Sequence, residues 1–110
     1  MSAPDLVELE AFFECEAALL DEGVDWRYNT LTFQTERAGV EVWCELQPSY
    51  ATIRAALRTN GVEIARADIA SFTALELSSE AGREVLTVRF DENATMWLVL
   101  RPEVSLRLAT

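Results

Sequence analysis

From position 26 to the end of the chain, apolar residues recur at every second position in a series of short segments. In residues 40–47, for example, Val42 and Cys44 alternate with Glu41 and Trp43. A period of two is the spacing of a β-strand that has one buried side and one solvent-facing side. Turn-forming residues separate the segments, so the pattern predicts a series of short antiparallel strands joined by tight turns.

Residues 48–59 fit two structures. The spacing of Tyr50, Ile53 and Leu57 is helical, but residues 51–57 also alternate and are followed by Asn60-Gly61, a strong hairpin signal. We favour the hairpin. A two-residue turn at Asn60-Gly61 places Leu57 opposite Ile64 and Arg58 opposite Glu63, so that apolar faces apolar and opposite charges meet.

Residues 3–22 have helical spacing instead, and this segment is expected to be a single helix. Its apolar stripe consists of Leu6, Leu9, Phe13, Ala17 and Leu20. Ser2 and Asp5 fit a capping box at the start of the helix, and Gly23 would end it. The expected fold is therefore α+β and a single domain, residues 1–110. An N-terminal amphipathic helix packs on a curved antiparallel β-meander of about six to eight strands in residues 26–110.

Charge is distributed unevenly along the chain. The net charge is −10, and residues 1–26 hold eight of the 19 acids and no base. Such a surface repels nucleic-acid phosphates and anionic membranes and attracts a basic partner, so we expect neither nucleic acid nor a membrane as partner. The start of the chain lacks the basic and apolar regions of a secretory signal, which favours a cytoplasmic location.

Catalytic chemistry has few candidate residues. The chain contains no histidine and no lysine, which removes the usual proton shuttle and the commonest metal ligand. Cys15 and Cys44 have no histidine to activate them as nucleophiles, and two thiols alone cannot complete a four-ligand metal site. We expect no enzyme activity, no catalytic residue, no cofactor and no metal.

The candidate partner-binding residues lie in two places. On the expected helix, acids occupy both flanks: Glu10, Glu14 and Asp21 on one, and Asp5, Glu8 and Glu16 on the other. On the strand at residues 40–47, Glu41, Trp43 and Glu45 share the polar side, where a tryptophan between carboxylates could anchor a basic partner. Trp97 belongs to a segment that is apolar on both sides and is expected in the core.

Three hypotheses for function follow from these observations. The first is a small acidic protein-binding domain that engages a basic partner; in composition the chain is similar to bacterial immunity proteins and to protein inhibitors of nucleic-acid enzymes, although no motif matches one such family. The second is a homo-oligomeric structural or accessory domain, most simply a homodimer. The third is a small-ligand-binding protein in which a curved sheet encloses a pocket.

Overall fold

The computed structural model describes residues 4–109. Within them the chain forms one α-helix, α1 (Leu6–Phe13), and two short 3-10 helices, η1 (Trp26–Tyr28) and η2 (Pro48–Tyr50). The nine strands are β1 (Ala18–Leu19), β2 (Leu31–Arg37), β3 (Val40–Gln47), β4 (Thr52–Thr59), β5 (Val62–Ile69), β6 (Phe72–Glu80), β7 (Arg83–Phe90), β8 (Ala94–Arg101) and β9 (Ser105–Ala109). None of the helices in residues 4–109 has the length and apolar character needed to cross a membrane.

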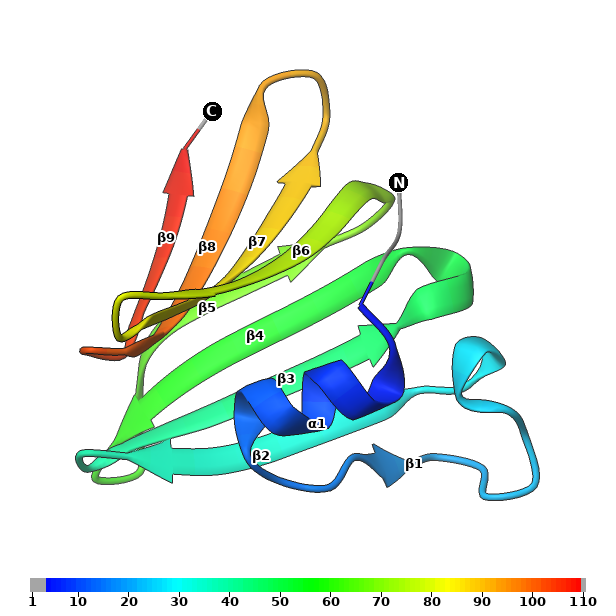
Figure 1. Ribbon diagram of the computed structural model, residues 1–110, viewed down its shortest axis with the longest axis horizontal. Helices are drawn as coiled ribbons and strands as arrows, with labels where there is room; N and C mark the ends of the chain where they lie inside the picture. Colours follow the sequence, from blue (N-terminus) through cyan, green and yellow to red (C-terminus); the bar gives the residue numbers. More distant parts are fainter. Residues whose placement is uncertain (1–3, 110) are drawn as a thin grey trace.

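The strands form an antiparallel meander that is divided into two sheets. In the first sheet the order is β1-β2-β3-β4-β5, and in the second it is β6-β7-β8-β9, so each strand pairs with the next one in the sequence. Figure 1 shows α1 lying across β2 and β3 on the side of the first sheet that faces the interior. The expected α+β class and the helix packed on an antiparallel meander are therefore confirmed.

Apolar side chains from the helix and both sheets meet in one core. Phe13 and Phe33 are fully buried, and their rings stack with centroids 4.6 Å apart. The inward residues of the second sheet include Val88, Met96 and Leu98, all fully buried. Burial of each such side chain stabilises the fold by about 1.5–3 kcal/mol. The helix is thus attached to the first sheet chiefly through aromatic packing.

The prediction of one helix over residues 3–22 is wrong in its length and in both of its ends. The capping box is formed by Asp5 and Glu8, not by Ser2, which lies outside the described residues. The helix ends at Phe13, because Glu14 adopts a left-handed backbone conformation (φ 55°, ψ 39°). The chain then reverses, and Ala18–Leu19 pairs with β2 as an edge strand, so Gly23 lies in a loop and ends no helix.

The hairpin at Asn60-Gly61 is confirmed, but only part of its predicted register is correct. Arg58 lies opposite Glu63 as expected, whereas Leu57 lies opposite Ala65, not Ile64. The register shifts by one residue between Leu57 and Arg58, and this β-bulge leaves Ile64 58% exposed. A bulge adds one unpaired residue to a strand. A register that is predicted by counting residues outward from the turn omits this extra residue and is therefore displaced by one position beyond the bulge.

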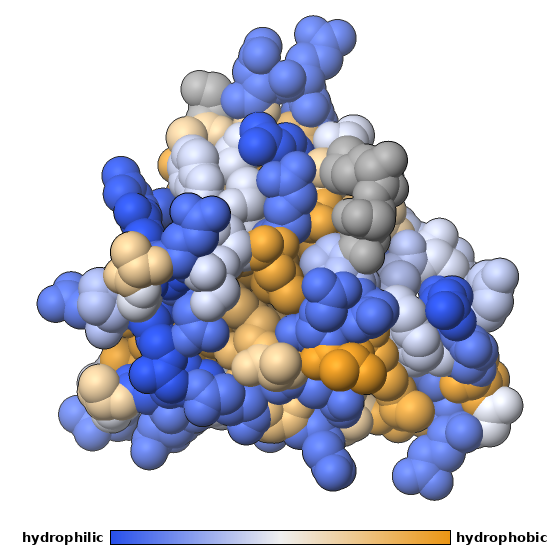
Figure 2. All heavy atoms as spheres, in the orientation of Figure 1, coloured by the Kyte–Doolittle hydropathy of each residue, from blue (hydrophilic) through white to orange (hydrophobic). Residues whose placement is uncertain are grey.

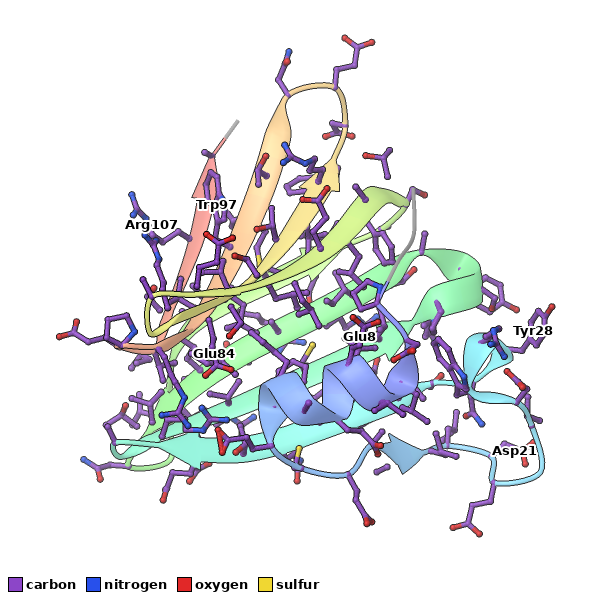
Figure 3. The ribbon with its side chains drawn as sticks, viewed as in Figure 1. Glu8, Asp21, Tyr28, Glu84, Trp97 and Arg107 are labelled. Carbon is purple, nitrogen blue, oxygen red and sulfur yellow. The ribbon has the colours of Figure 1, made fainter. Side chains whose placement is uncertain are left out.

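Trp97 is also placed differently from the expectation. Its neighbours Met96 and Leu98 are the residues of β8 that are fully buried, so Trp97 points to the outer side of the second sheet and is half-buried. There it lies opposite Arg107 of β9, and Figure 3 shows the two labelled side chains close together. The expectation that Trp97 belongs to the core is wrong. Trp97 and Val99 are apolar because the outer side of β8 is itself partly covered from solvent, not because it faces the core.

Candidate protein-binding surface

The outer side of the first sheet carries three of the predicted site residues. Glu41, Trp43 and Glu45 of β3 alternate with Val42, Cys44 and Leu46, which are buried beneath α1. Strict alternation along one strand places all three on the side of the sheet away from the helix. The structure thus brings these three residues together on one surface, as the pattern indicated.

Trp43 is the centre of this surface and is flanked by a cation. In the strand register it lies beside Ala56 of β4, which in turn lies beside Arg66 of β5. Ala56 is only 1% exposed although it points outward, so larger neighbours cover it. The guanidinium of Arg66 lies 5.7 Å from the centre of a Trp43 ring, within the range of a cation–π contact.

Two carboxylates hold Arg66 in place. Glu63 accepts a hydrogen bond from Nη1 and Asp68 accepts one from Nε, each at 3.2 Å. These contacts raise the pKa of Arg66, the hydrogen bond to Asp68 being the largest cause. The guanidinium of Arg66 that contacts Trp43 is therefore held by ion pairs with Glu63 and Asp68 and remains charged.

A groove of about 640 Å³, here called the Trp43 groove, runs over this part of the sheet. Near one end, Glu36 of β2 and Glu41 of β3 lie directly opposite each other in the register. Within residues 4–109 neither carboxylate forms an ion pair. The groove is lined by Gln34, Thr35, Glu36, Glu41, Val42, Trp43, Arg58 and Arg66.

A second groove, of about 400 Å³, connects the outer side of the sheet to the edge strand β1. Glu45, which pairs weakly with Arg54 at 4.0 Å, lines it together with Leu20. Leu20 is 80% exposed, and the next residue is Asp21. Glu45 therefore lines this groove directly, and Asp21 follows a residue that lines it.

The loop that carries Asp21 is fixed by Asn29, a polar residue that is only 6% exposed. The Asn29 side-chain oxygen accepts from the Asp21 N–H at 3.2 Å, and its amide donates to the carbonyls of Asp21 and Val24. Figure 3 shows Asp21 and Tyr28 at the same end of the molecule. Tyr28 and Tyr50, from the contacting 3-10 helices, are 71% and 74% exposed and add aromatic surface there.

Glu10 and Glu14, the remaining predicted site residues, make contacts within the fold. Glu10 accepts a hydrogen bond from the Ala17 N–H at 2.8 Å. Glu14 forms ion pairs with Arg101 and, at 3.4 Å, with Arg37. Arg101 also forms an ion pair with Glu84. The hydrogen bond from Arg101, followed by the charge of Arg37, lowers the pKa of Glu14. These two acids stabilise the chain reversal after α1; their contribution to partner binding stays a prediction.

The predicted site residues did not include Glu36 and Arg66, which lie on this surface, or the buried Asn29, which fixes the loop that carries Asp21. The signal for Glu36 was present, because a two-residue turn at Ala38-Gly39 places position 36 opposite position 41. The prediction of Arg66 required the β4–β5 register, which the bulge alters.

Figure 2 shows the opposite side of the first sheet, the one bearing α1, where apolar patches are interrupted by hydrophilic side chains.

Among residues 4–109, the structure contains no group of three or more acidic, histidine or cysteine side chains arranged to hold a metal ion. Cys15 and Cys44 are free thiols. Burial, which is the largest cause, together with the charges of Glu45 and Cys15 raises the pKa of the Cys44 thiol to about 12. A protonated, buried thiol is a poor nucleophile, so Cys44 is poorly suited to covalent chemistry.

Comparison with known proteins identifies a fold but no family. No protein-family model matches the sequence, and no curated protein matches it. The structure is similar to a chain of the contact-dependent growth inhibition toxin–immunity protein complex from Klebsiella pneumoniae 342, with a TM-score of 0.78. The match covers 98% of this chain and 95% of that chain at 14% sequence identity. At this identity the similarity establishes a shared fold.

Proposed function

We propose that this chain is an immunity-type protein, which binds a basic toxin domain and thereby inhibits it. The observation that carries the proposal is the outer side of the first sheet, where Trp43 lies between Glu41 and Glu45 above two neighbouring grooves. The shared fold with a chain of a toxin–immunity complex supports the same conclusion. Because the chain has no histidine or lysine, we assign it to the inhibitor side of such a pair and not to the enzyme side.

The size of the chain and the acidic residues of this surface suit a protein partner. A standard interface buries about 800 Å² on each partner, which is about 12% of the 6679 Å² accessible surface of this chain. Acidic residues near the interface accelerate encounter with a basic partner, and aromatic residues at its centre supply most of the affinity. We therefore expect the toxin domain to cover both grooves and to present a basic surface to them.

We expect a toxin-like protein to be encoded beside this chain in its source genome, and the test is direct binding to that protein. We expect a complex by isothermal titration calorimetry, with weaker affinity at higher salt, and restored growth when both are expressed in a host that the toxin arrests. Reversal of charge at Asp21 and Glu45 should weaken the complex at least tenfold, while Glu92→Arg in the β7–β8 turn should not. Absence of both a complex and growth rescue would refute the proposal, and a dimer of this chain alone by light scattering would favour the self-association alternative.

A further inference from the structure

We propose that the Trp43 groove receives an arginine side chain of the partner, whose guanidinium lies between Glu36 and Glu41 and against Trp43. This inference rests on the proposed function, because it specifies which group of a basic partner the surface recognises. Three features of the groove support it: a pair of carboxylates that forms no ion pair within residues 4–109, although Arg58 lies opposite Glu41 in the register, a tryptophan that already accepts one guanidinium, and enough free volume for a long side chain.

The carboxylate pair is the first feature. Glu36 and Glu41 are directly opposite each other on adjacent strands, a position at which like charges destabilise a sheet. Both side chains belong to exposed residues and make no ion pair among the described residues. A guanidinium has five donors in a planar fork and can bridge two carboxylates, so an incoming arginine would turn repulsion into attraction.

The second feature is the way the protein uses Trp43 in its free state. Arg66 places its guanidinium 5.7 Å from the ring centre, which shows that this tryptophan accommodates a planar cation. Arg66 is held on the β5 side by Glu63 and Asp68, whereas Glu41 lies two residues from Trp43 on the same strand and Glu36 lies opposite Glu41 on β2. Trp43 therefore has a cation toward β5, and the two carboxylates lie farther along β3 and toward β2.

Charge and volume complete the argument. Glu36, Glu41, Glu63 and Asp68 contribute four negative charges in and beside the groove, and Arg58 and Arg66 contribute two positive ones, which leaves two charges uncompensated. The groove volume of about 640 Å³ is within the range of about 300–1,000 Å³ found for ligand sites. Arginine suits the site better than lysine, since it can both stack on tryptophan and bridge two carboxylates.

The experiment uses the intact chain and the peptide acetyl-Gly-Arg-Gly-amide as probe. Its citrulline analogue, which has nearly the same shape but no charge, is the control ligand. We expect the Arg peptide to shift the Trp43 indole N–H signal in a saturable manner in nitrogen-15 NMR spectra, and the citrulline peptide to leave it unchanged. In the double variant Glu36→Gln/Glu41→Gln the dissociation constant should rise at least tenfold, whereas Glu92→Gln should match the wild type.

Misfolding is controlled within the same experiment. Removal of the two carboxylates relieves their mutual repulsion and loses the attraction between Glu41 and Arg58, so the melting temperature should stay close to that of the wild type. Lost binding at an unchanged melting temperature then reflects the lost carboxylates. Equal shifts with the citrulline peptide, or unchanged affinity in the double variant, would overturn the inference. If the double variant still binds the toxin-like partner as the wild type does, the groove assignment fails and the immunity function stands. If the Arg peptide binds as described but no toxin-like partner does, the immunity function fails and the groove assignment stands.

Discussion

Substitution of Phe13 by alanine tests whether aromatic packing holds α1 and the acidic segment that follows it to the first sheet. Phe13 is 0% exposed and stacks on Phe33 at 4.6 Å with an angle of 17° between the rings. Truncation of a buried phenylalanine costs about 3–5 kcal/mol, because apolar contact is lost and a cavity remains. With an unfolding entropy of about 2.1 cal/mol/K per residue, or roughly 0.23 kcal/mol/K for this chain, the melting temperature should fall by about 13–22 °C.

The assay is urea and thermal unfolding followed by circular dichroism. Val7→Ala is the matched control, because Val7 lies on the same helix and is 73% exposed; we expect it to change stability by no more than about 0.5 kcal/mol. A double-mutant cycle between Phe13 and Phe33 should give a coupling of about 0.5–1.5 kcal/mol from ring stacking. If Phe13→Ala differed from Val7→Ala by less than about 1 kcal/mol, the packing of α1 on β2 described above would be incorrect.

Two further predictions concern titrating side chains. Because Arg101 and Arg37 lower the pKa of Glu14, that carboxylate stabilises the fold above its ordinary value of 4.5, and the contribution is lost as the pH falls through the lower folded-state value. The melting temperature of Glu14→Gln should therefore lie below that of the wild type at about pH 7, and the difference should shrink below about pH 4; a constant difference across this range would contradict the assignment. With its pKa raised to about 12, Cys44 should resist alkylation at about pH 8 until the protein unfolds, and mass spectrometry should detect modification of the less buried Cys15 first.

The strands were predictable because their pattern and their burial have the same cause. A strand with one side against a core must alternate, so residues 40–47 identified both the buried side and the outer side of β3. Asn60-Gly61 was equally informative, since a type I′ two-residue turn needs positive φ at both positions, and both have it (53° and 77°). Strand alternation and turn residues are local signals, and predictions based on them are correct where the tertiary contacts favour the same structure.

The helix end could not be obtained in the same way. Ala17, Leu19 and Leu20 continue the apolar content of α1, and only the reversal at Glu14 separates them from it. That reversal is stabilised from far away in the sequence, because Arg37 donates a hydrogen bond to the Phe13 carbonyl and Arg101 pairs with Glu14. Tertiary contacts of this kind override a helical pattern. A short stretch of sequence around Glu14 contains neither Arg37 nor Arg101, so local spacing could not predict the reversal.

The position of the helix end also decides which acids can act together. On one continuous helix, Glu10, Glu14 and Asp21 would share a flank; in the structure Glu10 and Glu14 are engaged at the end of α1, and Asp21 lies beyond β1. The edge strand β1 and the residue after it, Leu20, line the same groove as Glu45, and Asp21 follows Leu20 in the sequence. The end of the helix at Phe13 therefore separates Asp21 from Glu10 and Glu14 and places it next in the sequence to a residue of the groove that Glu45 lines. We expect one partner to contact both Asp21 and Glu45, so charge reversals at these two positions should weaken the same complex.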